Sequence, residues 1–493
     1  MSEETPVEGT SPQPRKRRLW LLIGAFMVAG ALVTAGVTAL LISIFQKRSE
    51  AEQPYFRVVE LTEQTDDPAV WGQNFPLQYE SYKKTAEMAP EDQQMQTPTA
   101  ADPRTVVAKS KIEEDPRLVT LWQGYAFSVD YRHPRGHAYM LEDQRLTKRV
   151  TSPQFKQPGA CLNCHASTVT IMNELGKGDM NAGFAAMNKM SYQDATKLAK
   201  HPVSCLDCHD PKTMQLRVTR PAFIEGIKEY KAGQGIKNYD VNAQATSQEM
   251  RAFVCAQCHV EYYFKGDEKT LTFPWDKGLT ADDALAYYDE VGWSDFTHKL
   301  TGAKAVKAQH PDFETWSQGV HARAGVTCAD CHMAYERVGA SKVSNHQVAS
   351  PMRDDKSINA SCLTCHHATE KEMKDRVENI HATYEKTKNV AFDAYTQLVH
   401  DIEAAMKNGT PAKNLEAARA YQRKAGFFID YVTSENSRGF HAPAYTNRLL
   451  NDVTDAARRG QMALRGEIYP PAGAPSPAPV GSPTPAPTVV TTP

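Results

Sequence analysis

Five copies of the motif Cys-x-x-Cys-His use every cysteine of this 493-residue chain. Two thiols at this spacing on one helical turn can each add to a vinyl group of a haem, and the imidazole of the next residue can then bind the iron as its proximal ligand. The pattern predicts five covalently bound haem c groups, attached at Cys161, Cys164, Cys205, Cys208, Cys255, Cys258, Cys328, Cys331, Cys362 and Cys365. The predicted proximal ligands are His165, His209, His259, His332 and His366.

A zinc site and a disulfide framework are the alternatives for a cysteine-rich chain. Zinc knuckles use paired Cys-x-x-Cys motifs and give no reason for a histidine directly after each second cysteine. A disulfide framework does not explain five identical tight spacings. The motifs therefore indicate a pentahaem c-type cytochrome, and haem c is attached outside the cytoplasm.

An apolar segment near the N-terminus predicts a membrane anchor. Residues 19–45 carry no charge and, as a helix, are long enough to span a bilayer with some tilt. The alternative is a cleaved signal peptide, whose apolar core is usually only about 7–15 residues long. The basic residues before the segment are Arg15, Lys16, Arg17 and Arg18. The positive-inside rule then predicts that residues 1–18 are cytoplasmic and that the chain after residue 48 is periplasmic.

Composition divides the rest of the chain. Residues 46–367 hold all five motifs and many short segments, so haems should fill their core. Residues 469–493 are uncharged and rich in Pro, Ala, Ser and Thr, which predicts a disordered tail that acts as a spacer. The formal net charge is -2, and the only dense basic cluster precedes the apolar segment, so nothing suggests a nucleic-acid partner.

Long helices are expected in residues 368–468. Residues 368–408 contain no Pro or Gly, and their apolar residues recur at helical spacing, as at Met373, Val377, Ile380, Tyr384 and Val390. After Gly409 and Pro411 the pattern resumes over 415–431 and again over 445–464. Such helices usually pack on each other or on a second subunit. We therefore expect a mainly α fold, with a haem-filled core and a C-terminal helical region that forms a dimer.

The histidine count leaves two functions open. Eleven of the sixteen histidines are not proximal candidates, which is enough to cap all five irons. A haem that only carries electrons usually has a ligand on both faces, whereas a catalytic haem keeps one face open. The count alone fits both an electron-transfer cytochrome and an enzyme.

Three strings resemble the ammonia-forming cytochrome c nitrite reductases. They are Cys255–Phe264 (CAQCHVEYYF), Lys307–Trp316 (KAQHPDFETW) and Arg135-Gly-His137. The resemblance covers roughly residues 120 to 450. It implies that residues 46–367 form a catalytic region that reduces nitrite to ammonium with six electrons, and that the haem at Cys161 and Cys164 is the five-coordinate active site.

The resemblance also assigns roles to other residues. The distal pocket would hold Arg149, Tyr262 and His310, where Arg149 binds the anion and a histidine with a pKa near the working pH donates protons. Taken alone, Arg149 would be a surface charge, Tyr262 a core residue and His310 the distal ligand of another haem. The second to fifth irons would be capped, in that order, by His346, His137, His441 and His321. The first iron should have no protein ligand opposite His165.

A calcium ion beside the active site is a further implication of the resemblance. Its ligands would be the Glu261 carboxylate, the Gln309 side-chain carbonyl and the backbone carbonyls of Tyr262 and Lys307, an all-oxygen set that suits a hard cation. Without the resemblance, Glu261 reads as a solvated carboxylate. The implied partners are nitrite, a membrane quinol-oxidising multihaem cytochrome as electron donor, and a second copy of the chain.

Three features depart from the family pattern. Most members bind the active-site haem through a lysine, in Cys-x-x-Cys-Lys, where this chain has His165. Typical members are secreted with cleaved signals, and the low-complexity tail has no clear counterpart. A pentahaem electron carrier is therefore the alternative, in which His298 or His367 would cover the first haem. Hydroxylamine-oxidising multihaem enzymes are a third class, but they carry more haems in each chain.

Overall fold

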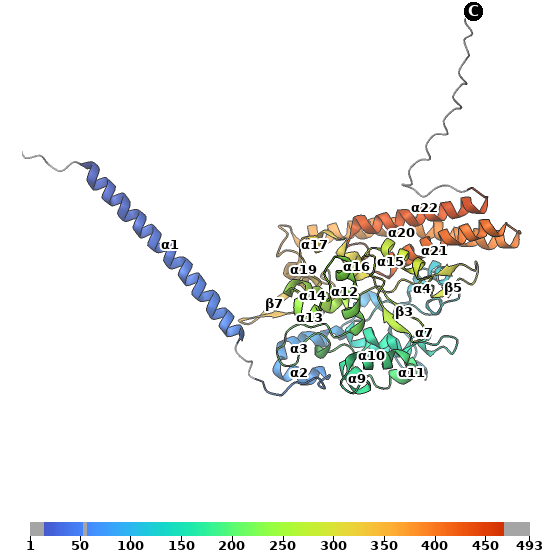
Figure 1. The fold of residues 1–493 in the computed structure, drawn as a ribbon, viewed down its shortest axis with the longest axis horizontal. Helices are drawn as coiled ribbons and strands as arrows, with labels where there is room; N and C mark the ends of the chain where they lie inside the picture. Colours follow the sequence, from blue (N-terminus) through green and yellow to red (C-terminus); the bar gives the residue numbers. More distant parts are fainter. Residues whose placement is uncertain (1–13, 53–56, 468–493) are drawn as a thin grey trace, which may run out of the picture. The chain divides into compact units, whose positions relative to one another are not determined.

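The computed structural model describes residues 14–52 and 57–467 and divides the chain into two units, residues 1–58 and 59–493 (Figure 1). The predicted tail, residues 469–493, and most of the predicted cytoplasmic segment lie outside the described residues. The predicted regions 46–367 and 368–468 meet within the second unit.

Among its described residues, the first unit contains one helix, α1 (Pro14–Glu52). Its stretch Arg18–Phe45 has a mean hydropathy of 2.2, and none of its most apolar window is buried. By length and composition this stretch could cross a membrane, and a signal sequence near the N-terminus would have the same character.

The second unit begins with many short helices that follow the Cys-x-x-Cys-His motifs. Its α-helices before the C-terminal region are α2 (Pro68–Asn74), α3 (Pro76–Lys83), α4 (Lys111–Glu114), α5 (Arg117–Leu121), α6 (Met140–Leu146), α7 (Lys148–Thr151), α8 (Leu162–His165), α9 (Val169–Leu175), α10 (Met180–Lys189), α11 (Tyr192–Ala195), α12 (Pro221–Gly233), α13 (Val241–Gln244), α14 (Ser247–Ala256), α15 (Ala281–Glu290), α16 (Asp312–Ser317), α17 (Val320–Arg323), α18 (Cys328–His332) and α19 (Asp355–Ser361). Short 3₁₀ turns lie between them: η1 (Lys84–Ala86), η2 (Pro90–Asp92), η3 (Ala126–Ser128), η4 (His137–Tyr139), η5 (Gly159–Cys161) and η6 (Cys205–Asp207).

Strands contribute little to the described residues. They form four two-stranded antiparallel sheets: β1 (Gln93–Met95) with β2 (Val106–Ala108), β3 (Tyr263–Lys265) with β4 (Thr270–Thr272), β5 (Phe296–Thr297) with β6 (Lys304–Ala305), and β7 (Tyr335–Val338) with β8 (Ser341–Ser344). In the β3–β4 hairpin Phe264 pairs with Leu271. This hairpin continues directly from the third Cys-x-x-Cys-His motif.

Three long helices form the C-terminal region, α20 (Glu370–Lys407), α21 (Ala412–Ser434) and α22 (Pro443–Leu464), and they lie side by side (Figure 1). A capping box starts α20: Thr369 Oγ1 accepts a bond from the Glu372 backbone N–H, and the Glu372 carboxylate accepts one from the Thr369 N–H. Gly409, with φ of +73°, and Pro411 separate α20 from α21. The prediction of a mainly α fold is confirmed.

Two apolar clusters make up most of the core. One surrounds the first and third motifs and includes Phe223, Trp275 and Phe313, whose rings meet edge-on or tilted. The other joins the C-terminal helices to the rest of the unit through residues such as Trp122 and Phe392. Because this second cluster is continuous, the C-terminal helices form part of the same compact unit as the motifs.

Candidate haem and active site

The five motifs sit on short helical turns at different depths. In the first motif Leu162 and Asn163 have no exposed surface, whereas in the fifth Cys365 is exposed. All ten cysteines lie within the described residues, and none of them forms a disulfide. The helical turn places the two thiols of each motif on one side, as thioether attachment to a haem needs.

Four histidine pairs lie at one characteristic spacing. A metal–nitrogen bond of about 2 Å on each side of an iron, plus roughly 1.2 Å from nitrogen to ring centre, separates two imidazole centroids by about 6.4 Å. The observed centroid separations are 6.2 Å for His137–His259 and 6.3 Å for His209–His346, His321–His366 and His332–His441. Each pair joins one motif histidine to one predicted distal histidine, and the spacing suits one iron between the rings.

Second-sphere bonds fix the orientation of most of these rings. The Nδ1 atoms of His209 and His332 lie 2.9 Å and 3.0 Å from the backbone carbonyls of Met214 and Ala349. An Nδ1–H held by a carbonyl leaves Nε2 unprotonated and available to a metal. These donor sets therefore fit haem iron, and backbone carbonyls are partners that sequence reasoning could not have named.

His259 differs because its Nδ1 faces a carboxylate, Asp312 Oδ2, at 3.3 Å. Burial opposes protonation of this ring, but Asp312 outweighs it and raises the pKa of His259 to about 9. A carboxylate partner makes an imidazole a stronger electron donor to a metal. Asp312 lies in the Lys307–Trp316 string, so the string carries a second useful residue beside His310.

A glycine is needed to place the ring of His137. Gly136 has φ of +108° and lies against the backbone carbonyl of Thr85, where an added Cβ would collide with the carbonyl oxygen. Only glycine adopts this conformation without strain and leaves room for the carbonyl. The Arg135-Gly-His137 string thus has a local structural reason.

His165 stands apart from the other four motif histidines. Among residues 57–467 no histidine ring faces it at the spacing of the four pairs. Its Nδ1 lies 3.2 Å from the Met140 carbonyl, so it too has a fixed orientation. His298, the alternative cap, instead has its two ring nitrogens beside the Thr120 carbonyl and the Thr301 hydroxyl, at 2.8 Å and 3.2 Å.

Two of the three predicted pocket residues, Arg149 and Tyr262, interact electrostatically with the first motif. Burial raises the pKa of Cys161 to about 12, and the charge of Arg149 opposes this rise. Burial also lowers the pKa of His165 to about 4, and Arg149 adds to that fall. Burial raises the pKa of Tyr262 well above its usual value, and the thiols of the first motif add to the rise. The structure therefore brings Arg149 and Tyr262 to the first motif.

Aromatic rings hold the guanidinium of Arg149. It lies 4.2 Å from the ring centre of Phe127 and 5.8 Å from that of Tyr131, and its Nε donates to Thr147 Oγ1 at 3.3 Å. Cation–π contacts of this kind fix a guanidinium without neutralising it. The charge of Arg149 thus stays available to an anion.

His310 is also close to the first motif, but its protonation differs from our expectation. Burial lowers the pKa of His310 to about 3, the charge of Asp312 opposes the fall, and His165 adds to it. The sequence analysis expected a pKa near the working pH, whereas this burial keeps the imidazole neutral at pH 7. An anion bound beside the ring would favour its protonated form.

The predicted calcium ligands lie together in the interior. Glu261 has no exposed surface, and its carboxylate accepts bonds from the Gln309 backbone N–H at 2.6 Å and the Tyr288 hydroxyl at 2.9 Å. The Gln309 side-chain amide donates to the Lys307 carbonyl at 3.3 Å, so a half-turn of that amide would turn its oxygen toward the same point. The Tyr262 carbonyl follows Glu261 directly along the chain. This is a compact set of oxygen donors.

A buried ion pair that the sequence analysis did not identify supports this set. Asp430 of α21 accepts bonds from Lys307 Nζ at 2.9 Å, Trp122 Nε1 at 2.9 Å and the Ala308 N–H at 3.2 Å. Lys307 and Asp430 are about 1% exposed. Nothing in the sequence near Asp430 marks it, because its partners lie far away along the chain.

Contacts between thiols of different motifs show which haem sites are neighbours. Contact with Cys164 of the first motif raises the pKa of Cys258 of the third motif. Contact with Cys328 of the fourth motif raises the pKa of Cys255, also of the third. The third motif therefore lies between the first and the fourth.

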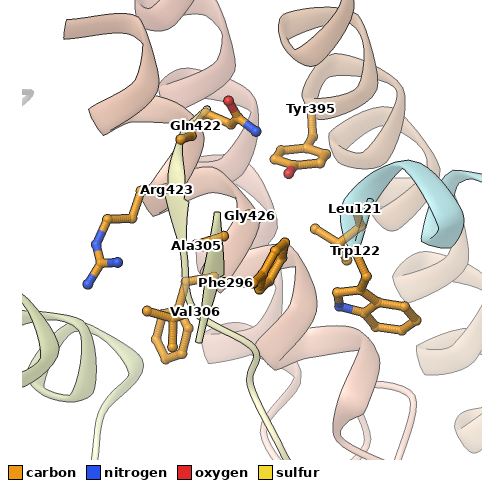
Figure 2. A pocket seen from close by; sticks show the side chains of 11 residues that line it. Leu121, Trp122, Phe296, Ala305, Val306, Tyr395, Gln422, Arg423 and Gly426 are labelled. Carbon is orange, nitrogen blue, oxygen red and sulfur yellow. The ribbon is translucent and has the colours of Figure 1, made fainter. Parts of the chain in front are cut away.

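A small cavity lies away from the motifs, between the C-terminal helices and the β5–β6 hairpin (Figure 2). Trp122 lines one side, and Tyr395, Gln422 and Gly426 line others. Its volume is about 10 Å³, which is room for about one water molecule. The buried Oε1 of Gln422 has no partner among the described residues and suits such a water. This cavity is not a candidate substrate site.

Comparison with known proteins decides the family. The sequence profile of the cytochrome c552 family matches residues 67–482. The chain belongs to the cytochrome c552 family. It is 35% identical over 459 residues to a cytochrome c-552 of Bacteroides fragilis, covering 91% of this chain and 87% of that protein. It is 33% identical over 456 residues to a cytochrome c-552 of Porphyromonas gingivalis, covering 90% of this chain and 84% of that protein.

One solved structure shares the fold of this cytochrome c552 family member. The cytochrome c nitrite reductase catalytic subunit, NrfA, of Desulfovibrio desulfuricans matches with a TM-score of 0.70 and 28% identity, over 83% of this chain and 88% of that one. That protein is described as having two calcium sites. The resemblance to nitrite reductases seen in the sequence is confirmed at the level of family and fold.

Proposed function

We propose that this protein reduces nitrite to ammonium at the haem attached to Cys161 and Cys164. The observation that carries the proposal is the solitary position of His165, the one motif histidine that no second histidine ring faces at iron-bridging distance. A haem with an open face can bind a substrate, whereas a haem held on both faces serves electron transfer. The similarity to a cytochrome c nitrite reductase supports nitrite as that substrate.

The four histidine pairs would hold the other haems as electron carriers. In this assignment His346, His137, His441 and His321 are the distal ligands of the second to fifth haems. When bound, the haems supply the electrons that the reaction consumes. The chain's part is to fix these imidazoles, several of them through an Nδ1 partner, and to exclude exchangeable ligands from these four irons.

The pocket residues would divide the work of binding and proton transfer. Arg149 stays charged and would hold the anion and later anionic species. His310 is neutral before substrate binds, and the arriving anion would raise its pKa and draw a proton to it. Tyr262, whose pKa is raised by burial, keeps its hydroxyl proton and would act as a second hydrogen-bond donor. His310, recharged with protons from water, would deliver the eight protons that the six-electron reduction takes up, while Arg149 and Tyr262 stabilise the bound species.

A calcium ion would organise this pocket through the residues next to Tyr262 and His310 in the chain. We assign it to the Glu261 carboxylate, the Gln309 side-chain oxygen and the carbonyls of Tyr262 and Lys307. Hydrogen bonds from Gln309 to Glu261 and to the Lys307 carbonyl support this assignment, and an all-oxygen set suits a hard cation. Glu261 and Gln309 precede Tyr262 and His310 in the chain. A cation held there would therefore fix both pocket side chains.

The wider setting of the enzyme follows from its N-terminal helix and its family. We propose that α1 is an uncleaved anchor, with the N-terminus in the cytoplasm and the haem-bearing unit in the periplasm. A membrane quinol-oxidising multihaem cytochrome would supply electrons. A homodimer would form through the C-terminal helices. Most of the apolar stripe of these helices packs within the chain. Val390 and Met406 are the large apolar side chains that stay exposed on them.

An electron paramagnetic resonance spectrum of the oxidised full-length protein tests the proposal. We expect one high-spin haem signal beside four low-spin ones, and the high-spin signal should change when nitrite is added. Steady-state reduction of nitrite with an artificial electron donor should yield ammonium. Five low-spin haems and no turnover would instead identify an electron carrier.

A further inference from the structure

Arg220 and Asp207 form an ion pair in the interior where the first three motifs meet. Neither residue has any exposed surface, and Arg220 Nη1 lies 2.8 Å from Asp207 Oδ1. Asp207 is the third residue of the second motif, and Arg220 immediately precedes α12. The pair takes no part in the chemistry assigned above.

Nη1 of Arg220 also donates to Thr219 Oγ1 at 3.0 Å, and two further donors of the guanidinium bind the backbone of the first motif and the residue after it. Its Nε donates to the Asn163 carbonyl at 2.6 Å, and its Nη2 donates to the Ala166 carbonyl at 3.0 Å. These two carbonyls lie on either side of Cys164 and His165 along the chain. The rigid guanidinium therefore holds the backbone on both sides of a proximal ligand.

Asp207 extends the same network to the second and third motifs. Its carboxylate accepts a bond from the Ser204 N–H at 2.7 Å, which closes the turn that starts the second motif. Its backbone carbonyl accepts bonds from Thr219 Oγ1 at 2.9 Å and from Gln257 Nε2 at 3.0 Å. Gln257 lies between the two cysteines of the third motif. One ion pair thus ties three attachment sites together.

The two charges lie at different motifs. The Arg220 guanidinium holds the two carbonyls that flank Cys164 and His165, at 2.6 Å and 3.0 Å, whereas Asp207 is itself part of the second motif. The positive end of the pair therefore lies at the first motif, and the negative end lies at the second.

Buried charges change haem reduction potentials because the oxidised iron carries one more positive charge than the reduced iron. A nearby cation disfavours the oxidised form and raises the potential, and a nearby carboxylate lowers it. We propose that Arg220 and Asp207 are positioning residues that fix the first three haems relative to one another and raise the potential of the first haem above that of the second. That this gradient directs electrons to the site of reduction rests on the proposed function.

Redox titration of the full-length, haem-loaded protein without nitrite tests the inference. Arg220→Gln should lower the potential of the first haem, and Asp207→Asn should raise that of the second. We expect each substitution to change the equilibrium distribution of an electron between the first and second haems by about tenfold. This corresponds to a shift in reduction potential of about 59 mV for a one-electron couple. Reference variants His165→Met and His209→Met identify which signal belongs to which haem.

A second ion pair offers a matched control. Asp330 occupies in the fourth motif the position that Asp207 has in the second, accepts a bond from the Thr327 N–H at 2.8 Å and pairs with Arg251 at 2.5 Å. Its side chain is 43% exposed and that of Arg251 is 23% exposed. Solvent should screen this pair, so Arg251→Gln should leave the potentials of the first three haems unchanged.

The sign of each shift separates a charge effect from a loss of structure. Loss of one partner leaves a buried unpaired charge and can impair folding, so the double variant Arg220→Gln/Asp207→Asn removes both charges and should bring the two potentials closer together. If Arg220→Gln fails to load haem, the potential shifts of Asp207→Asn and of the double variant test the inference in its place. Shifts of one sign in both single variants, or unchanged potentials at full haem content, would overturn the inference. A wild type without nitrite turnover would refute only the proposed function, because the titration needs no substrate.

Discussion

At the residue scale, the side chains around His165 should differ in how they affect turnover and binding. His310→Ala should lower nitrite turnover far more than nitrite binding, because proton delivery acts in the transition state. General acids commonly contribute about 10²–10⁴-fold, so the loss in kcat should fall in that range. Steady-state nitrite reduction with an artificial donor measures it, on variants whose haem content is confirmed.

Two further variants sharpen this test. Arg149→Ala should weaken both binding and turnover, since its charge acts on the bound anion and on later species. His133→Ala is the control, because His133 lies beside Glu114 near the surface and outside the pocket. Unchanged turnover in His310→Ala would mean that water or Tyr262 delivers protons. Unchanged turnover in Arg149→Ala as well would place the active site elsewhere.

Calcium binding should depend on pH through Glu261. Burial raises the pKa of this carboxyl well above its usual value, so without a cation it keeps its proton to a higher pH than a free carboxyl does. Calcium needs the carboxylate, so binding releases a proton wherever the carboxyl is protonated, and calcium affinity should rise with pH over that range. Calorimetry of chelator-treated protein in buffers of different ionisation enthalpy measures this release. Glu261→Gln should abolish it, and equal affinity at all pH values would count against Glu261 as a ligand.

Sequence and structure agree best where a residue belongs to an unusual string. The distal histidines could be paired with their motifs from such strings and from the family resemblance, and the ring separations support the same pairing. The partners of Nδ1, such as Met214 and Ala349, could not be predicted, because a backbone carbonyl does not depend on the residue type. The sequence analysis missed Arg220 and Asp430, because the sequence does not show whether a charged residue is buried or exposed.

At the element scale, Asp430 joins α21 to the segment that leads to His310, because it accepts bonds from Lys307 Nζ and the Ala308 N–H. Asp430→Ala would leave the ammonium of Lys307 buried without its carboxylate partner, with the Ser434 hydroxyl and the Ala308 carbonyl as its remaining hydrogen-bond partners. Breaking a buried pair commonly costs about 3–5 kcal/mol. We expect a clearly lower guanidinium unfolding midpoint. Asp393→Ala is the matched control, since Asp393 pairs with Arg117 while its side chain is 73% exposed. Equal midpoints for the two variants would contradict a stabilising role for the Lys307–Asp430 pair.

The long helices could be predicted closely, and the short ones could not. The segment 368–408 corresponds to α20, and its apolar spacing matches buried Met373, Val377 and Tyr384. Val390 was expected on the same stripe but is 57% exposed. Single-turn helices such as α8 lack a periodic pattern, because one turn is too short to show it, and packing around the motifs holds them.

At the scale of the whole molecule, the exposed Val390 locates the proposed dimer contact. Sedimentation in mild detergent should show a dimer, and Val390→Glu should shift it toward the monomer, because a charge would enter an apolar contact. Val291→Glu is the control, since Val291 is 50% exposed at the end of α15, outside the C-terminal helices. A monomeric wild type would rule out the dimer, and a dimer unaffected by Val390→Glu would place the interface elsewhere.

The position of His441 has a consequence for how the molecule is made. His441 faces His332 across the fourth haem site, yet it follows every Cys-x-x-Cys-His motif in the chain. Because a chain is made from its N-terminus, the fourth motif is made well before its partner ring. The proposed fourth haem site can therefore be completed only after α21 and the loop that carries His441 have been made. The last part of the polypeptide thus completes a site whose first residues were made much earlier.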